Sequence, residues 1–125
     1  DYDFIGSYIS SALWSFPQGE QGEIELCIDD LSSEAKERLE AVASKFLDNV
    51  IVQAILRHCG SNFDTVKEMY SQVGHSFWLN HNGHGSGFWD YSEYWGEAGS
   101  EKLDKISVTF DEIDLYVGDD GKIYA

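Results

Sequence analysis

Three of the four histidines in this chain, His75, His81 and His84, lie within ten residues, and Asp90 follows closely. Imidazole and carboxylate groups bind zinc and also serve as general acids and bases. No cysteine joins this set, which lacks a convincing fourth ligand, and His84 has a simpler structural use inside a glycine-rich loop. We therefore expect no bound metal or cofactor. A small metal- or histidine-dependent enzyme working at the His75–Asp90 loop remains the alternative.

Patterns for nucleophilic catalysis and for phosphate binding are weak in this sequence. Ser61, Ser86 and Ser107 do not lie in the glycine-flanked elbow that exposes a catalytic serine. The glycine-rich run 83–87 falls inside an expected hairpin, whereas a phosphate loop joins a strand to a helix. The sequence therefore assigns no catalytic or cofactor-binding residue and favours a protein that is not an enzyme.

The charge balance narrows the range of partners. The chain has 23 acidic and 8 basic residues among 125, for a net charge of −15. A surface that binds nucleic acid needs clustered Lys and Arg to neutralise phosphates, so direct binding to nucleic acid is excluded. Attachment to an anionic membrane is disfavoured for the same reason, and no apolar run approaches the roughly 20 residues needed to cross a bilayer. The expected partner is a protein with a basic, nucleic-acid-binding surface.

Carboxylates in the C-terminal third form a candidate acidic interaction surface. Duplex DNA carries one charge per about 1.7 Å of its axis, so a net charge of −15 gathered on one face is of the right order to imitate a short duplex. The alternative is that the charge only keeps the protein in solution, which predicts acids and bases interspersed over the surface. The candidate residues are Glu93, Glu97, Glu101, Asp104, Asp111, Glu112, Asp114, Asp119 and Asp120.

The first half of the chain predicts helices in a single domain spanning residues 1–125. Apolar residues at three- and four-residue steps indicate a helix over residues 3–14. Ser32 is the expected N-cap of a long helix that bends near residues 48–49 and ends at Gly60. Residues 61–62 are expected to cap a further helix that stops at Gly74. We also expect the two cysteines, Cys27 and Cys59, to be reduced and buried.

The second half predicts hairpins. Aromatic segments at 76–80 and 87–90 indicate strands joined by a tight turn at residues 82–83, with 77–79 paired antiparallel to 88–89. Residues 99–110 indicate a helix with a Glu101–Lys105 pair on its exposed face. Residues 113–117 and 122–124 indicate a second hairpin around a turn at 118–121. The predicted fold is α+β, with three to four helices packed on a small antiparallel sheet built from two hairpins.

Three stretches of the sequence resemble a known family of proteins, and this resemblance implies where the chain originates. Residues 74–90, GHSFWLNHNGHGSGFWD, resemble the string GHDFWLTRNGHGxGFWD in a family of small proteins encoded by tailed phages and prophages. Residues 12–15, ALWS, and 115–124, LYVGDDGKIY, resemble further parts of that family. Ser76 stands where the family has an acid, and Asn80-His81 stand in place of Thr-Arg. The matching motif residues are His75, Trp78, Asn82, Gly83, His84, Gly85, Gly87, Phe88, Trp89 and Asp90.

The family has no settled activity, so the resemblance implies a phage origin and little about chemistry. The leading hypothesis is a phage or prophage accessory protein that binds and modulates a host protein in the bacterial cytoplasm. In one form it is an acidic DNA mimic that inhibits a DNA-binding or defence protein. A third hypothesis is a structural or dimerising phage component, a monomer or homodimer with exposed aromatic residues at Trp89, Tyr91, Tyr94 and Trp95.

Overall fold

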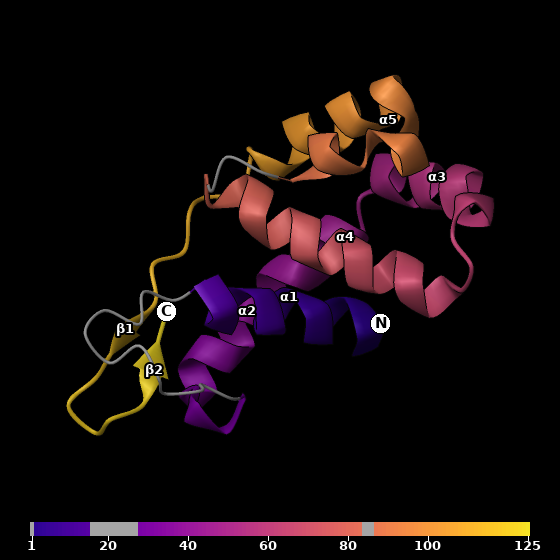
Figure 1. Ribbon diagram of the computed structural model, residues 1–125. Coiled ribbons are helices and arrows are strands. Elements are labelled where there is room, and N and C mark those ends of the chain that lie inside the picture. Colours follow the sequence, from indigo (N-terminus) through magenta and orange to yellow (C-terminus); the bar gives the residue numbers. More distant parts are fainter. Residues whose placement is uncertain (1, 16–27, 84–86) are drawn as a thin grey trace.

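The structure is a computed structural model that describes residues 2–15, 28–83 and 87–125 (Figure 1). These residues form five α-helices: α1 (Tyr2–Ser15), α2 (Ser33–Leu47), α3 (Val50–Cys59), α4 (Val66–His81) and α5 (Ser92–Ser107). Short 3₁₀ turns are η2 (Ile28–Asp30), η3 (Gly60–Asn62) and η4 (Phe88–Tyr91), and two strands, β1 (Tyr116–Val117) and β2 (Ile123–Tyr124), form a hairpin. Among the described residues no helix combines the length and apolarity that crossing a membrane requires.

The predicted α+β class is wrong, because the described chain is mainly helical and its sheet has two short strands. Residues 77–79, expected in a strand, belong to α4, and residues 88–89 belong to η4. A short aromatic run reads equally well as a strand or as a buried stretch of helix. Here Met69, Val73 and Phe77 recur every four residues and place their side chains in the core, so the helical period prevails.

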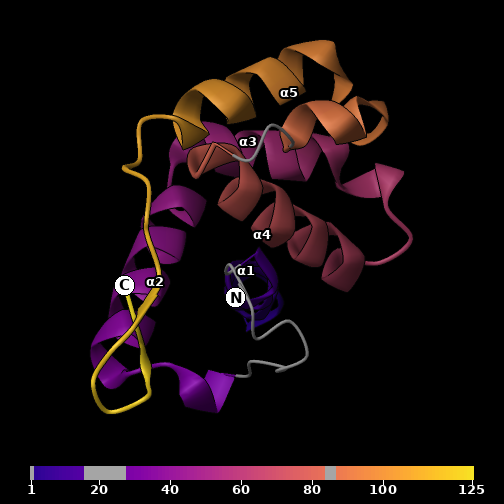
Figure 2. The same ribbon diagram turned by 60° about the vertical axis from the view of Figure 1, so that its left-hand side comes forward.

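Gly74, expected to end a helix, instead lies in the middle of α4. A Cβ atom at this position would lie 2.4 Å from the Phe4 carbonyl oxygen and 2.9 Å from the Tyr8 amide nitrogen of α1. Glycine therefore lets α1 and α4 pack backbone to backbone, and Figures 1 and 2 show these helices next to each other. The glycine was a signal for close packing and not for a helix end.

The helical prediction for residues 33–59 is confirmed, although the chain breaks fully where a bend was expected. The Ser32 side chain accepts a hydrogen bond from the Ala35 amide at 3.0 Å, as predicted for the N-cap of α2. Asn49 then caps α3, because its Oδ1 accepts from Ile51 N at 2.8 Å and from Val52 N at 3.3 Å. The cap of α4 is Thr65, so the expectation of a cap at residues 61–62 is wrong.

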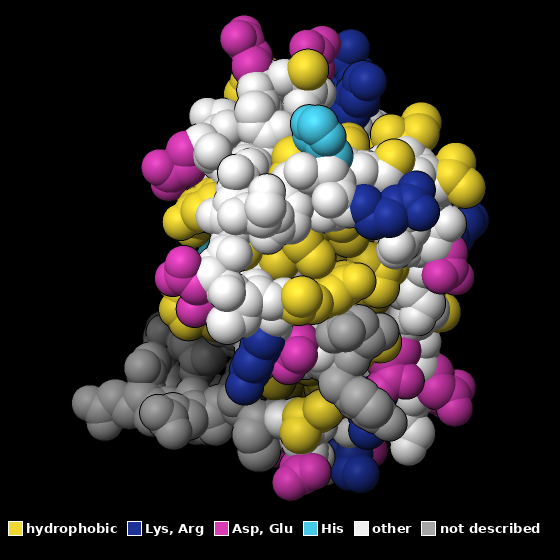
Figure 3. Space-filling view, turned by 90° about the vertical axis from the view of Figure 1, so that its right-hand side faces the viewer, with side chains coloured by type: hydrophobic (Ala, Val, Ile, Leu, Met, Phe, Trp, Pro, Cys, Tyr) yellow, Lys and Arg dark blue, Asp and Glu magenta, His cyan; other side chains and the backbone are white. Residues whose placement is uncertain are grey.

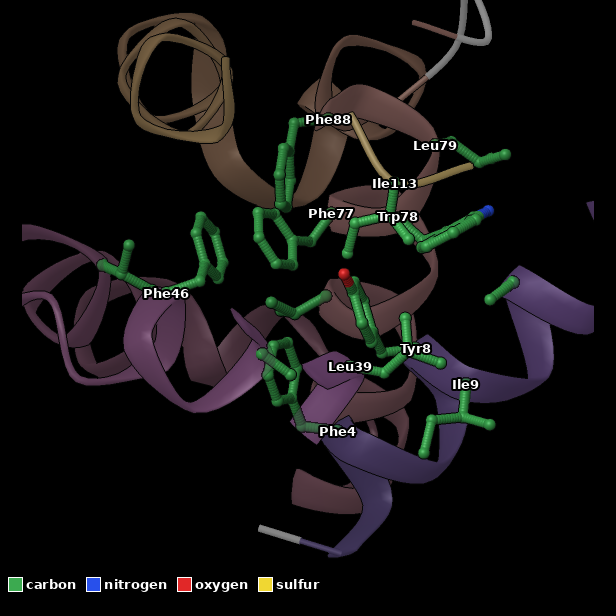
Figure 4. Close-up of a cluster of buried hydrophobic side chains, with 14 of the residues drawn as sticks. Phe4, Tyr8, Ile9, Leu39, Phe46, Phe77, Trp78, Leu79, Phe88 and Ile113 are labelled. Atoms are coloured by element: carbon green, nitrogen blue, oxygen red, sulfur yellow. The ribbon is translucent and has the colours of Figure 1, made fainter. Parts of the chain in front are cut away.

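Aromatic rings from four elements meet at the centre of the core (Figure 4). The Phe46 ring of α2 stacks on the Phe77 ring of α4 with centroids 3.9 Å apart. Phe4 and Tyr8 of α1 stack around this pair, and Phe88 of η4 closes the cluster from the other side. Burying rings of this size supplies much of the hydrophobic stabilisation of so small a chain.

The C-terminal segment begins after α5 and ends against α2. Within α5 the chain kinks at Gly96, which has a φ of 74°. The strand predicted from residue 113 is shorter than expected, because the register pairs only Tyr116 with Tyr124 and Val117 with Ile123. The predicted turn at 118–121 is confirmed by a 3.0 Å bond from Gly121 N to the Gly118 carbonyl. The Ile123 carbonyl accepts from Ser32 N at 2.8 Å and so fixes the hairpin to the start of α2.

Candidate protein-binding surface

The motif that carries the phage resemblance contributes mainly to the core. His75 and Trp78 lie in α4, and Trp78 is buried. Gly87 and Asp90 fasten η4, since the Asp90 carboxylate accepts from Gly87 N at 3.0 Å. Trp89, by contrast, is 48% exposed. Two motif residues, His84 and Gly85, lie outside the described residues.

His81, at the end of α4, uses both ring nitrogens inside the molecule. The Tyr8 hydroxyl lies 2.8 Å from Nε2, and the Asp111 carbonyl oxygen lies 3.2 Å from Nδ1. Because a carbonyl oxygen only accepts, Nδ1 carries the proton and Nε2 accepts from Tyr8. Burial raises the pKa of Tyr8, which keeps its hydroxyl protonated as a donor. This arrangement leaves His81 no free lone pair for a metal ion and ties α4 to the segment after α5.

Asn82 makes the second link between α4 and that segment. Its Oδ1 accepts from Ile113 N at 2.6 Å, while its Nδ2 donates to the Trp78 carbonyl at 2.9 Å. Gly83 follows with a φ of 68°, the left-handed conformation that commonly ends a helix. The Asn-Gly pair that predicted a hairpin therefore ends α4 and holds the main chain near residue 113. Together, His81 and Asn82 form what we term the α4 clamp.

The α4 clamp holds the first part of an acidic arm, defined as residues 111–120. Ile113 is buried, while five carboxylates of the arm are exposed. The arm contains no Lys or Arg. Figure 1 shows it running from the end of α5 to β1 without a helical turn. The exposed carboxylates are Asp111, Glu112, Asp114, Asp119 and Asp120.

At the far end of the arm, Asp120 is held in the hairpin turn. Its Oδ1 accepts from Lys122 N at 3.0 Å, and its Oδ2 accepts from the Tyr124 hydroxyl at 2.8 Å. These two bonds, the backbone one first, lower the pKa of the Asp120 carboxyl group. The carboxylate therefore stays charged down to lower pH than an unpartnered one would.

The other four candidate carboxylates, Glu93, Glu97, Glu101 and Asp104, lie on α5. Figures 1 and 2 show α5 at one end of the molecule and the β1–β2 hairpin at the other, so the nine residues form two groups. Within the α5 group, Glu101 pairs with Lys105 at 2.8 Å, as predicted. On the face shown in Figure 3, acidic and basic side chains are interspersed, as the solubility alternative predicts for that face.

Ser11 and His75 form a pair that resembles a nucleophile with its base. The Ser11 hydroxyl lies 2.6 Å from His75 Nδ1, and burial lowers the pKa of His75. Ser11, however, is buried in the middle of α1, where the helix uses the backbone N–H groups that an oxyanion would need. The contact joins α1 to α4. In the described part of the chain, His, Cys, Asp and Glu side chains make no group of three suited to a metal.

Other expected features are partly corrected. Of the four aromatic residues expected to be exposed, Trp89 is exposed, Tyr91 and Tyr94 are half-buried, and Trp95 is buried. Cys59 is a free, buried thiol as expected, and Cys27 lies outside the described residues. Sequence reasoning missed the α4 clamp because its bonds span about 30 residues.

Comparisons with models of protein families, with curated proteins and with solved structures found no match to this chain.

Proposed function

We propose that this chain is a phage or prophage accessory protein that binds a basic surface of a host protein in the bacterial cytoplasm. The acidic arm is the part that makes the contact. The phage origin rests on the motif at residues 74–90, and the mode of action rests on the arrangement of the arm. The proposed activity is occupation of a site and not a chemical reaction.

The observation that carries this proposal is the way in which the arm is held. Its carboxylates point to solvent, while its main chain is fixed through the Asp111 carbonyl and the Ile113 amide. A surface that is fixed before binding loses less conformational entropy on association. A charged segment needed only for solubility gains nothing from such fixing. Of the two residues that fix it, Asn82 matches the motif that suggested the family, whereas His81 stands where that family has an arginine.

The density of charge on the arm suits a site that binds nucleic acid. Residues without helical structure advance about 3.3 Å each, so Asp111, Glu112 and Asp114 span roughly 10 Å. One strand of B-DNA carries one charge per about 3.4 Å of axis. The arm thus presents a spacing comparable to that of a short single strand. A basic cleft on a DNA-binding or defence protein is the expected partner, with the arm as a local mimic of phosphate groups.

The test compares two triple variants that change the net charge equally. The arm variant carries Asp111→Lys, Glu112→Lys and Asp114→Lys. The control carries Glu37→Lys, Asp64→Lys and Glu68→Lys, which replace exposed carboxylates outside the candidate acidic surface. Each variant and the wild type are immobilised and exposed to a bacterial lysate at 0.1 M and 0.5 M NaCl, with and without duplex DNA as competitor.

The expected result is capture of a DNA-binding host protein by the wild type and the control. High salt and duplex DNA should both release it, because exposed charges are screened and the cleft is shared. The arm variant should bind at least about tenfold more weakly, since three exposed ion pairs of about 0.2–1 kcal/mol each are reversed. Equal loss in both triple variants, or capture that resists both salt and DNA, would contradict a role for the arm.

A further inference from the structure

The β1–β2 hairpin has one edge without a strand neighbour. Among the described residues, β1 and β2 make up the whole sheet. On the far side of β2, Ile123 bridges to Leu31, and its carbonyl accepts from Ser32 N at 2.8 Å. The free edge is therefore the outer edge of β1, which belongs to the end of the acidic arm.

The hydrogen bonds of the hairpin determine which main-chain groups face this edge. Gly118 N donates to the Lys122 carbonyl at 2.8 Å, so these two residues form a hydrogen-bonded pair. Hydrogen-bonded and non-hydrogen-bonded pairs alternate along an antiparallel ladder, so the next pair, Val117 and Ile123, is not hydrogen-bonded. The N–H and C=O groups of Val117 therefore point away from β2. No described residue bonds to them, and Val117 is 55% exposed.

The chain before β1 extends this edge. Main-chain groups of an extended chain point the same way at every second residue. Figure 1 shows no helical turn before β1, so Leu115 offers a second N–H and C=O to the edge. Two residues further back, the Ile113 N–H donates to Asn82 Oδ1 at 2.6 Å. Asn82 thus supplies at residue 113 the kind of acceptor that a partner strand would supply at residues 115 and 117.

The two faces of β1 differ in chemistry. Val117 shares its face with Ile123, which is buried in the core. Tyr116 lies on the opposite face, where its ring stacks on that of Tyr124 with centroids 5.8 Å apart. A hollow of about 360 Å³ lies beside these rings, and its lining residues are Tyr116, Gly118, Asp119, Asp120 and Tyr124. Aromatic rings and carboxylates around one hollow suit the cationic side chains of Arg and Lys.

The charges around the edge select one kind of occupant. Residues 111–125 hold five acidic residues against one basic residue, Lys122. In the described part of the chain Lys122 forms no direct ion pair with Asp119 or Asp120. A second copy of this edge would bring carboxylates against carboxylates and be repelled. A segment rich in Arg or Lys is attracted instead, and it must be extended to meet the N–H and C=O groups of the edge.

We propose that the outer edge of β1 binds an extended basic segment of the partner protein as an added antiparallel strand. In that segment basic residues alternate with apolar ones, so that apolar side chains lie beside Val117 and basic ones lie over the Tyr116 ring. The inference rests on the proposed function, in which the acidic arm contacts a basic host protein. It adds that main-chain hydrogen bonds act together with charge. The carboxylates attract the segment, and the edge selects its conformation.

The test uses capped hexapeptides of alternating arginine and valine, whose binding to the full chain is measured by calorimetry at 0.05 M NaCl. In the proposed strand the peptide valine opposite Val117 directs its N–H at β1, whereas the arginine N–H groups point away. One peptide therefore carries N-methyl groups on its valines, and its matched control carries them on its arginines. The two peptides have the same charge and the same number of methyl groups.

Two valine-to-proline variants test the edge from the protein side. Val117→Pro removes the N–H that points out of β1, at an edge position where strands tolerate proline. Val50→Pro is the control, because Val50 is 79% exposed and directly follows the Asn49 N-cap of α3, where proline suits the helix. Val50 lines the α3–α5 groove, a mainly apolar hollow of about 620 Å³ between these helices that shares no lining residue with the hairpin. The peptide pair uses the wild type alone, so it does not depend on how either variant folds.

The expected result is binding of the unmethylated peptide to the wild type and to Val50→Pro. N-methyl groups on valine, or Val117→Pro, should each weaken binding at least about fivefold, because main-chain hydrogen bonds are lost, whereas N-methyl groups on arginine should change it less than about twofold. Equal binding of the two methylated peptides would overturn strand addition and leave an arm that acts by charge alone. A wild type that captures its host protein but does not bind the peptide would also overturn strand addition. Failure of both capture and peptide binding would overturn the proposed function as well.

Discussion

The acidic arm and the α3–α5 groove are built by opposite means. The arm has polar side chains beneath it, since His81 and Asn82 bind its main chain and leave its carboxylates in water. The groove has apolar walls, and its α3 wall comes from a helix without acids. A chain of net charge −15 thus keeps the helix α3 free of carboxylates and gathers them densely on the arm. The difference teaches that net charge alone describes neither surface.

The largest expected effect comes from the core that both regions share. Phe77 stacks on Phe46 and on the His81 ring, with centroids 4.5 Å apart in the second pair. Phe77→Ala should lower the free energy of unfolding by about 3–5 kcal/mol, because a buried ring is replaced by a cavity. Denaturant titration measures this change. Trp89→Ala, in the same motif but 48% exposed, is the control and should cost far less. Equal costs would show that Phe77 is not central to the core.

Two asparagines allow the regions to be compared by matched substitutions. Asn82 links α4 to the arm through the Ile113 amide, and Asn62 donates to the Tyr94 carbonyl beside the groove at 2.7 Å. Asn82→Ala should cost about 1–3 kcal/mol, because it leaves a partly buried N–H without a partner. Asn62→Ala should cost less, since its site is exposed and water can replace the bond. Thermal unfolding of both variants checks the order, and the reverse order would contradict the account of the α4 clamp.

Two glycines make a finer comparison. Gly83 ends α4 beside the arm and Gly96 kinks α5 beside the groove, with φ of 68° and 74°. Replacing either by alanine should cost about 1 kcal/mol, because the left-handed region is unfavourable for a residue with a Cβ atom. Gly83→Ala should cost slightly more, since its Cβ would lie 3.0 Å from a Glu112 carboxylate oxygen, whereas Gly96 has open space. Denaturant titration resolves the pair, and a costlier Gly96→Ala would show that the kink carries additional strain.

The smallest expected effect concerns pH. Burial lowers the pKa of His75 below its usual 6.5, so below about pH 6.5 the unfolded chain binds a proton at this residue more readily than the folded chain. Its contribution to stability is therefore complete above pH 6.5 and declines as the pH falls. His75→Asn keeps an acceptor for Ser11 but removes the titration. The melting temperature should fall less between pH 7 and pH 5.5 in this variant than in the wild type. An identical fall would assign the pH dependence to other groups.

The sequence predicted the features that depend on neighbours along the chain. The N-cap at Ser32, the helices within 33–59, the Glu101–Lys105 pair and the turn at 118–121 all follow from contacts a few residues apart. The prediction of a hairpin at residues 76–90 was wrong, because the apolar run Phe77-Trp78-Leu79 is too short to distinguish a helical period from a strand period. Gly74 and Asn82-Gly83 locally favour a helix end and a hairpin turn. In the folded chain Gly74 lies at the contact between α1 and α4, and Asn82-Gly83 ends α4.

The candidate site was only partly accessible to sequence reasoning. Its carboxylates were identified, but their division between α5 and the arm depends on where the chain runs after Ser107. The α4 clamp joins residues about 30 positions apart, and the groove joins helices separated by α4, so no local pattern encodes either. Val50 and Ile51 are apolar yet lie outside the buried stripe of Val52 and Leu56, and this pattern is a sequence signal for a second apolar face on α3.

The most direct test of the central claim, that the motif holds the acidic arm in place, is amide hydrogen exchange at Ile113. This amide donates to Asn82 Oδ1 at 2.6 Å and belongs to a buried residue in a segment without regular structure. It should exchange slowly in the wild type and far faster in Asn82→Ala, while amides of α3 keep their protection. An Ile113 amide that exchanges as fast as exposed loop amides in the wild type would contradict the claim.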